Sequence, residues 1–371
     1  MKTMPNEKEI IITDEESAVR PTAAPTVATD ITSDSELADA LLSGVIDDPS
    51  HPFALLFSYN GRRTVVCRGY TGDGHGGVGD AIGTDTRFRL ASVTKQLVAR
   101  AVTALVFQGK MDFDDGIRTF FPSLPDVYEA VTVRMLLNHT SGIPNYEAMP
   151  DDGSGLQVVD TDVPVYLATR HKTYFTPGSD YRYSNSGFVL LGLIVEKVSG
   201  MSLSEAMKTL VFDPAGMEKT LVNIQGKTVI PKRAYGHRTE NGSVTERDQY
   251  RWSATVGDGG VYSCLEDLDL WIDDMLKNNE RLSGSMLKDV MLPGGAMTGY
   301  GMGIRLKKAA GKRIICHTGE TIGFRSAVMF SPDIPLRLVF LTNREVNEPF
   351  DVINIALKTV FGESLETPIQ I

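Results

Sequence analysis

Hydrophobic and polar positions follow two different periods along this chain. Near its start, Leu37, Leu41 and Val45 recur at helical spacing, and Ser35 precedes them as a candidate helix cap. The preceding segment, 1–34, is rich in Pro, Thr, Ala and acidic residues and shows no period. We therefore expect a disordered or loosely attached N-terminal arm followed by an amphipathic helix.

Strand-like runs occur near both ends of the chain, and helical patterns dominate between them. Asn60-Gly61 between the first two runs is a strong hairpin signal. Strands at both ends with helices between them predict one discontinuous α/β domain, 35–115 and 295–371, with a mainly helical insertion at 116–294. The runs are 53–59, 63–68, 86–90, 312–317, 325–330 and 336–343, and a final helix is expected over 350–361.

Composition narrows the possible functions. Apolar residues make up 42% of the 371 positions, and 47 acidic against 37 basic residues give a formal charge of −10. Such an acidic chain without a basic cluster is a poor binder of nucleic acid or anionic membranes. The longest apolar run, 188–195, is too short for a transmembrane helix. Three widely spaced cysteines favour neither a disulfide framework nor a zinc site.

Ser92 and Lys95 stand three positions apart where the third strand-like run passes into a helical pattern. Residues i and i+3 of a helix lie on one face, so the lysine amine can take a proton from the serine hydroxyl or stabilise its alkoxide. A helix cap followed by a solvated lysine has the same spacing. Ser285 and Lys288 repeat it where we expect a capped surface helix.

Two further short motifs contain groups that can assist a serine nucleophile. Tyr183 can act as a base in a cationic pocket, and Asn185 can both donate to and accept from a substrate amide. His317, Thr318 and Gly319 end a strand-like run, where an open strand edge offers backbone N–H groups to an oxyanion. Taken singly, these motifs also fit a packed Tyr with a capping Asn, and a strand end with a satisfied His.

Cofactor chemistry finds little support in the sequence. Six histidines are present without a His-x-x-x-His pair or a carboxylate cluster, so we expect no metal centre and resistance to chelators. The glycine-rich stretch 72–79 precedes no helical pattern and no Lys-Ser/Thr, which favours a loop over nucleotide binding. We therefore predict that the protein uses no cofactor.

The order of the three motifs is more informative than any one of them. Ser-x-x-Lys, Tyr-x-Asn and His-Thr-Gly follow one another at intervals of 91 and 134 residues. In this the chain resembles the serine β-lactamase and penicillin-binding-protein superfamily over residues 36–362. It is most similar to the class C β-lactamase branch, which includes serine DD-carboxypeptidases, D-aminopeptidases and family VIII esterases. Supporting stretches are 88–95, 136–143, 259–263 and 299–303.

The resemblance implies a fold of the α/β (α+β) class, with an antiparallel sheet flanked by helices, an inserted all-helical domain and an active site in the cleft between them. It implies that Ser92 is the acylated nucleophile, that Lys95 activates it, and that Tyr183 is the general base or acid. Asn185 would hold the substrate amide, and the backbone N–H groups of Ser92 and Glu320 would form the oxyanion hole.

The third motif points to one part of this branch. Typical class C β-lactamases have Lys-Thr-Gly there, whereas His317-Thr318-Gly319 resembles a secreted DD-carboxypeptidase. In that enzyme an Arg about a dozen residues earlier binds the substrate carboxylate, and Arg305 matches it; a solvated strand Arg is the alternative. Trp252 matches a cleft-lining aromatic residue, with core packing as the alternative. Glu320 departs from the usual small residue and could recognise a substrate amine.

The sequence therefore predicts a serine hydrolase of DD-carboxypeptidase-like or D-stereospecific peptidase or amidase type. Its expected substrate is a small molecule or short peptide with a D-residue or a free carboxylate, and neither nucleic acid nor membrane is an expected partner. A family VIII-type esterase or acyltransferase, a β-lactamase and a non-catalytic relative stay open. As written, the N-terminus shows no secretory signal, which favours the cytoplasm; a removed leader would favour the periplasm or secretion.

Overall fold

The computed structural model describes residues 33–46, 48–151, 153–277, 282–346 and 348–362. The expected N-terminal arm lies outside these residues except for its last two positions. There the structure corrects one expectation, because Ser33 caps the first helix instead of Ser35. The Ser33 hydroxyl accepts from the Glu36 N–H and the Glu36 carboxylate accepts from the Ser33 N–H, which is a capping box.

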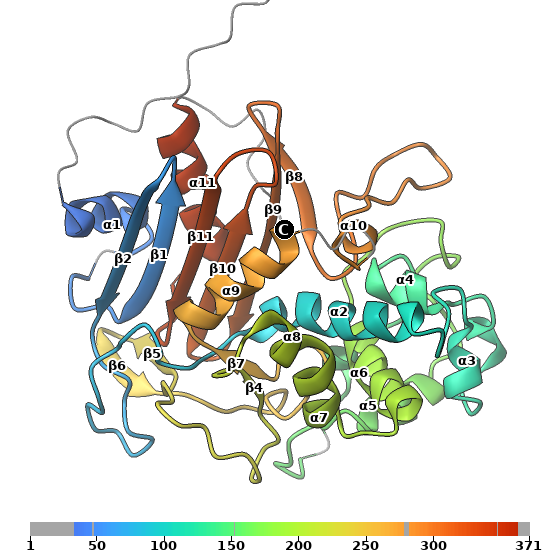
Figure 1. The fold of residues 1–371 in the computed structure, drawn as a ribbon. Helices are drawn as coiled ribbons and strands as arrows, with labels where there is room; N and C mark the ends of the chain where they lie inside the picture. The colour runs from blue at the N-terminus through green and yellow to red at the C-terminus, as the bar shows by residue number, and fades with distance from the viewer. Residues whose placement is uncertain (1–32, 47, 152, 278–281, 347, 363–371) are drawn as a thin grey trace, which may run out of the picture.

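Strands from both ends of the chain form one six-stranded antiparallel sheet, blue and orange-red in Figure 1. The strands are β1 (Phe53–Tyr59), β2 (Arg62–Arg68), β8 (Arg305–Ala309), β9 (Lys312–Thr321), β10 (Phe324–Phe330) and β11 (Leu336–Thr342). Their order is β2-β1-β11-β10-β9-β8, so the first strand pairs with the last, Ala54 opposite Leu341. This confirms the expected sheet built from N- and C-terminal strands.

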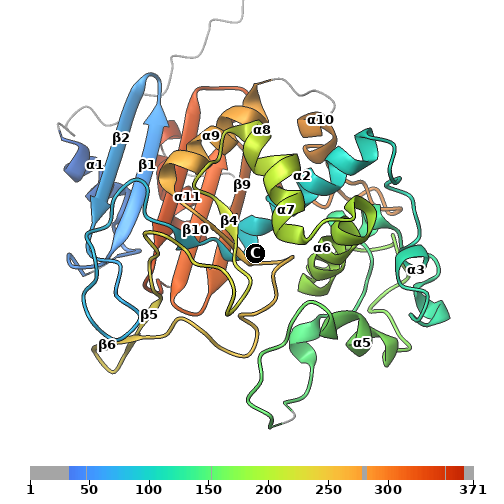
Figure 2. The same ribbon diagram turned by 60° about the horizontal axis from the view of Figure 1, so that its bottom comes forward.

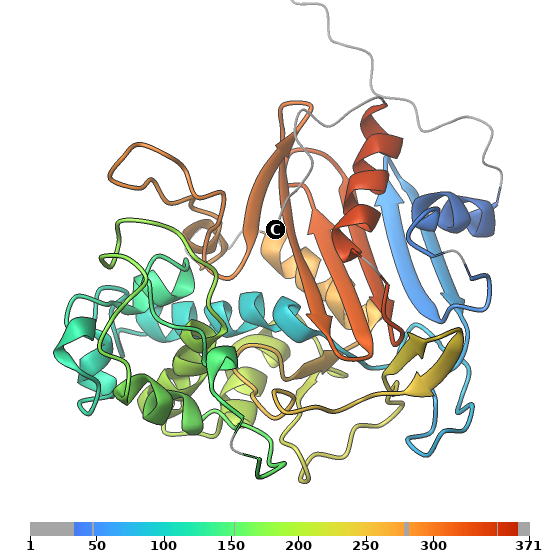
Figure 3. The same ribbon diagram turned by 180° about the vertical axis from the view of Figure 1, so that it is seen from behind.

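Helices cover both faces of this sheet, as Figures 1 and 3 show from opposite sides. They are α1 (Asp34–Leu42) and α11 (Pro349–Phe361) on one face, and α9 (Leu265–Leu276) on the other, whereas α2 (Thr94–Phe107) packs mainly against other helices. In β1, Phe53 and Leu55 belong to the first apolar layer, whereas Ala54 and Leu56 belong to the second. Because successive strand residues point to opposite faces, a sheet covered twice requires an unbroken apolar run.

The remaining helices gather around α2 on the side of the sheet where β8 lies (Figure 2). Helix α7 continues through a π-helical turn into α8. Among the described residues no single helix is long and apolar enough to cross a membrane, but α6 together with α7–α8, bent by 84°, meets the criteria of length and composition. These helices are α3 (Ile117–Phe120), α4 (Val133–Leu137), α5 (Asp162–Ala168), α6 (Asn185–Ser199), α7 (Leu203–Met207), α8 (Asp213–Ala215) and α10 (Leu282–Met286).

Five short strands complete the described structure. β3 (Phe88–Arg89), β7 (Val261–Ser263) and β4 (Leu221–Val222) form a small sheet in that order. β5 (His237–Glu240) and β6 (Ser243–Glu246) form a hairpin. The small sheet matters for function because β3 leads directly into the turn that carries Ser92.

Two expectations about the middle of the chain need comment. Ser285 lies near the end of α10 and Lys288 lies beyond it, so the expected helix capped at Ser285 is wrong. Helix α9 packs against β1 and β11, although it falls inside the expected insertion. The domain boundaries at 115/116 and 294/295 stay a prediction.

Candidate active site

Ser92 lies on a strained turn between β3 and α2. Ala91 before it has φ +47°, a left-handed conformation that disfavours any residue with a Cβ, and a 3-10 turn then leads into the helix. The turn is held from two sides. The Leu90 N–H donates to the Val261 carbonyl at 2.9 Å, and the Leu90 carbonyl accepts from the Ser326 hydroxyl at 2.8 Å.

Lys95 reaches Ser92 from the first turn of α2. Its Nζ donates to Ser92 Oγ at 2.9 Å and to the Asp258 carbonyl at 2.9 Å, and the side chain is fully buried. The contact expected from the i, i+3 spacing is therefore present. The ion pairs of the described residues do not include Lys95. An amine in this place can stabilise a serine alkoxide when charged and accept the hydroxyl proton when neutral.

Tyr183 lies against the same amine, with Lys95 Nζ 5.0 Å from the centroid of its ring. Its hydroxyl is buried and has no hydrogen-bond partner in the described structure, and the same holds for Asn185 Oδ1 at the start of α6. Leaving such groups unsatisfied is costly, so sites that retain them usually satisfy them with a ligand or water. Asn185 lines the Ser92 pocket, so its oxygen is available to a molecule there, whereas Tyr183 is not among the residues that line the pocket.

His317 lies beside the rings of Tyr183 and Tyr300 and does not line the Ser92 pocket. It is 1% exposed; its Nδ1 lies 2.6 Å from the Thr318 carbonyl and its Nε2 lies 3.0 Å from the Tyr300 hydroxyl. We assign the proton to Nδ1, because a carbonyl can only accept, so that Nε2 accepts from Tyr300. Burial, reinforced by the charges of Arg305 and Lys95, holds the pKa of His317 well below its ordinary value. The imidazole is therefore neutral.

Gly319 allows β9 to approach the turn that carries Ser92. A Cβ at this position would lie 2.0 Å from the Leu90 carbonyl oxygen and 2.4 Å from Ser326 Oγ, so no side chain fits. Pairing with β8 ends at Cys316, so residues 317–321 pair with β10 on one side and leave the other edge open. The oxyanion hole expected at the backbone N–H groups of Ser92 and Glu320 stays a prediction.

The pocket around Ser92 is rich in carboxylates, namely Glu147, Asp258 and Glu320. Asp258 is buried; its Oδ2 accepts from the Tyr146 hydroxyl at 2.9 Å, and its Oδ1 has no partner. Burial raises the pKa of Glu320, although nearby Arg325 opposes the shift. Trp252 and Asn185, both expected from the sequence, also line this pocket. Arg89, a buried cation, also lines it, so three acids face one base and the balance of charge favours a ligand with an amine.

Arg305 on β8 is only 7% exposed and does not line the pocket, so a solvated strand Arg is excluded. Its guanidinium carbon lies 5.9 Å from the ring centroids of both Tyr183 and Tyr300 and 5.1 Å from that of Phe350. No acid pairs with it among the described ion pairs, and its Nε has no partner. A buried cation that belongs to no described ion pair can hold a substrate carboxylate if the rings of Tyr183 and Tyr300 move apart.

Several residues of the site were not singled out from the sequence. His139 and Tyr300 fall in stretches that already marked the family resemblance, so their motifs carried a usable signal. Tyr146 and Asp258 carried none, because nothing in their local sequence shows that one donates to the other 112 positions away. Among the described residues, no group of three or more His, Cys, Asp or Glu side chains could hold a metal ion.

Comparison with known proteins identifies the family. The Beta-lactamase family model matches residues 38–361. The chain belongs to the Beta-lactamase family. Within it, the chain is 30% identical over 309 residues to penicillin-binding protein 4* of Bacillus subtilis, covering 77% of this chain and 67% of that protein. It is thus a serine hydrolase of the Beta-lactamase family, as the sequence predicted.

Two further relatives are informative. The D-aminopeptidase of Brucella anthropi is 28% identical over 288 residues, covering 74% of this chain and 53% of the relative. The crystal structure of a penicillin-binding protein from Bacillus halodurans aligns with a TM-score of 0.68 at 26% identity, covering 81% of this chain and 93% of that one. The chain spans about half the length of the D-aminopeptidase, so activity and substrate remain to be proposed.

Proposed function

We propose that the protein hydrolyses amide bonds through an acyl-enzyme formed on Ser92. The observation that carries this proposal is the 2.9 Å hydrogen bond between Lys95 Nζ and Ser92 Oγ. It joins a nucleophile to a fully buried amine that is held from behind by the Asp258 carbonyl at 2.9 Å. The first turn of α2 fixes the backbone of Lys95.

The proposed reaction has two steps. Ser92 Oγ attacks the substrate carbonyl carbon while its proton passes to Lys95 Nζ, and the carbonyl oxygen becomes an oxyanion held by the backbone N–H groups of Ser92 and Glu320. The C–N bond then breaks, and the departing nitrogen takes the Tyr183 hydroxyl proton, which leaves Tyr183 as a tyrosinate. In the second step, water gives a proton to this tyrosinate and attacks the acyl carbon. The ester C–O bond breaks as Lys95 Nζ returns its proton to Ser92 Oγ, which releases the acid and restores Ser92, Lys95 and Tyr183.

The substrate class we favour is an amide of a D-amino acid with a free amino group. Glu147, Asp258 and Glu320 surround the pocket beside Ser92, and a buried Asp258 oxygen has no partner. An ammonium group next to the scissile carbonyl would satisfy that oxygen and offset the carboxylate charges. The name of the D-aminopeptidase relative supports D-stereospecificity. Asn185, whose Oδ1 is unpartnered, would hold the substrate amide.

A second candidate function is removal of a C-terminal D-residue, as in a DD-carboxypeptidase. One observation favours it: the buried Arg305 guanidinium has no acid partner among the described ion pairs, yet lies 5.9 Å from the centroid of the Tyr183 ring. A substrate carboxylate would supply the missing anion. The penicillin-binding protein 4* relative agrees with this reading. Carboxypeptidase activity requires Arg305 to become accessible, whereas hydrolysis of an amino-acid amide does not.

Hydrolysis of three matched substrates separates these functions. We would compare D-phenylalanine amide, its N-acetyl derivative and a peptide ending in D-Ala-D-Ala, with the L-amide as stereochemical control. Preferred cleavage of D-phenylalanine amide, whose amino group is free, supports the first function. Preferred cleavage of the peptide supports the second. Intact mass spectrometry should show an acyl adduct that is absent in Ser92→Ala. No turnover and no adduct with any substrate would contradict both.

Glu147→Gln tests the amine reading directly. Loss of one charge from the pocket should raise KM for the amide with a free amino group by about tenfold, and should change KM for the N-acetyl substrate little. Glu218→Gln, an exposed acid outside the Ser92 pocket, is the matched control and should change neither. If Glu147→Gln changes KM equally for both substrates, the Glu147 carboxylate does not recognise the amino group.

A further inference from the structure

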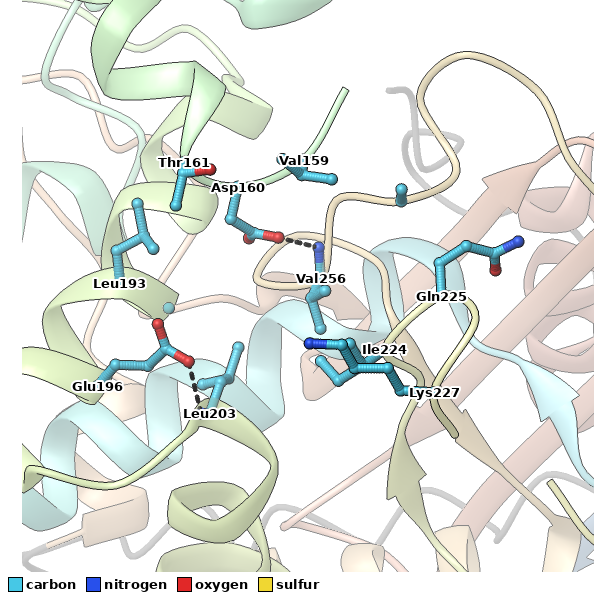
Figure 4. Close-up of a pocket in the computed structure, with 12 residues that line it drawn as sticks. Val159, Asp160, Thr161, Leu193, Glu196, Leu203, Ile224, Gln225, Lys227 and Val256 are labelled. Atoms are coloured by element: carbon cyan, nitrogen blue, oxygen red, sulfur yellow. Dashed lines mark hydrogen bonds between the residues drawn. The ribbon is translucent and has the colours of Figure 1, made fainter. Parts of the chain in front are cut away.

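A second cavity lies behind the loop that carries Asp258. Its volume is about 300 Å³ and it shares no lining residue with the Ser92 pocket. Figure 4 shows its walls, which come from α6, the start of α7, and the segments before α5 and after β4. Within the loop, Ala254 and Val256 line this cavity, whereas Thr255 and Asp258 line the Ser92 pocket. The loop is therefore a partition between two cavities.

The lining of this cavity is mainly apolar. Leu193 and Leu203 face it from one side, and Ile224 and Val256 from the other (Figure 4). A volume near 300 Å³ lies at the small end of ligand pockets, so it suits a molecule of amino-acid size better than a peptide. Its apolar walls favour an aliphatic or small aromatic group on that molecule.

Charged groups of both signs face the same space. Glu196 accepts one hydrogen bond, from the Leu203 N–H at 2.8 Å, which leaves its second carboxylate oxygen available. Lys227 is exposed and belongs to no ion pair of the described residues, and Figure 4 shows its amine turned toward the middle of the cavity. A ligand that matches both groups carries an ammonium and a carboxylate next to an apolar body.

The cavity is connected to Lys95 by hydrogen bonds through the loop. Asp160 at the cavity wall accepts from the Val256 N–H at 2.8 Å and from the Gly257 N–H at 3.0 Å. The next residue, Asp258, holds Lys95 Nζ through its carbonyl. Gly257 packs closely on α6, because a Cβ there would lie 2.5 Å from the Phe188 carbonyl oxygen. The loop therefore links Asp160 and Val256 at the cavity wall to the carbonyl that holds Lys95.

We propose that this cavity is an effector site for a free amino acid with an apolar side chain. Glu196 holds the ammonium group of the ligand, Lys227 holds its carboxylate, and the side chain packs on Leu203 and Ile224. Occupancy fixes the loop through Val256 and so sets the position of Lys95. The binding step stands on the cavity alone, whereas the effect on rate rests on the proposed function of Lys95.

Binding is tested by calorimetry on the full Ser92→Ala chain, so that no turnover interferes. Leucine, in both enantiomers, should bind at least about tenfold more tightly than leucine amide, which lacks the carboxylate, or 4-methylpentanoate, which lacks the amine. Lys227→Ala should remove the advantage over the amide, and Glu196→Gln the advantage over the acid. Lys110→Ala replaces an exposed lysine three residues beyond α2; it is the matched control and should change nothing.

Hydrogen exchange tests the connection between the cavity and the loop independently of activity. Leucine should slow exchange of the Val256 and Gly257 amides in the Ser92→Ala chain, and Lys227→Ala should abolish this slowing. If leucine binds equally well to Lys227→Ala but is lost in Asn185→Ala, it occupies the Ser92 pocket and the proposal fails. If neither enantiomer of leucine binds, the proposal is also overturned. Neither result depends on whether the proposed amidase activity is found.

Discussion

His139 and Tyr183 are stacked, with ring centroids 4.3 Å apart and ring planes inclined by 37°. His139 is 1% exposed, adopts φ +60° and accepts from the Ser184 N–H through Nδ1 at 3.2 Å. It thereby fixes both the backbone next to Tyr183 and the face of the tyrosine ring. Burial, aided by the charge of Lys95, keeps the pKa of His139 well below its ordinary value, so the ring is neutral. We regard it as a positioning residue for Tyr183.

Substitution of His139 should therefore lower kcat more than it changes KM. His139→Asn can keep the left-handed backbone and an acceptor for Ser184, whereas His139→Ala loses the acceptor and the stacking. We expect His139→Ala to lower the free energy of unfolding by about 2–4 kcal/mol, with a smaller loss for His139→Asn. Urea titration and steady-state kinetics would measure both. A kcat of His139→Ala equal to that of the wild type would contradict the positioning role.

Gly319→Ala should disrupt the site without touching any group that reacts. The added Cβ would lie 2.0 Å from the Leu90 carbonyl oxygen, which is backbone and cannot rotate away. The strand and the Ser92 turn must separate, so we expect loss of acyl-enzyme formation and a lower melting temperature. Gly284→Ala is the matched control, because nothing lies within 4 Å of its added Cβ. In a helix that control should be neutral or slightly stabilising.

Lys95→Met should separate activity from stability. The substitution removes the amine but retains an unbranched side chain, so acylation of Ser92 should fall by roughly 10²–10⁴-fold. Because Lys95 is fully buried and no described ion pair includes it, its loss leaves no carboxylate unpaired. We therefore expect the melting temperature to stay level or rise. Intact mass spectrometry measures the acylation and calorimetry the melting. A large drop in melting temperature would show a structural role instead.

Much of the sheet could be predicted because its strands are covered on both faces. Residues 53–59 were expected as a strand and form β1 with the same bounds. Both faces of this strand are covered, so its sequence is a nearly continuous apolar run. Strand β8 was missed: its sequence, Arg305-Leu-Lys-Lys-Ala309, alternates weakly and carries three cations. Only its pairing with β9 identifies it as a strand, and pairing is a property of the fold rather than of the segment.

The candidate site divides in a similar way. Ser92 and Lys95 could be paired from the sequence because their contact is local, three residues apart on one turn. Contacts between distant segments gave no such signal. Asp258 lies 163 positions from Lys95, and Arg305 becomes buried only when β8 closes against the aromatic rings of Tyr183 and Tyr300. A local motif thus predicted the contact between Ser92 and Lys95, whereas the supporting contacts required the folded chain.

Asp160 should make stability depend on pH in a direction opposite to an ordinary salt-bridged acid. Burial raises its pKa from 3.8 to about 7, despite the hydrogen bonds from Gly257 and Val256 that favour the charged form. A raised acid pKa means that the folded state holds a proton which the unfolded state has lost. Its contribution to stability is full below the unfolded pKa and declines as pH rises toward about 7.

Asp160→Asn should therefore flatten the dependence of unfolding free energy on pH between about 4 and 7. The amide retains one acceptor oxygen for the loop but cannot titrate, so the slope is informative even if the variant is less stable throughout. Urea titrations at several pH values across this range measure it. Asp162→Asn, a nearby acid in the first turn of α5, is the control and should keep the wild-type slope. An unchanged slope in Asp160→Asn would mean that this carboxyl titrates normally and does not report on the loop behind Lys95.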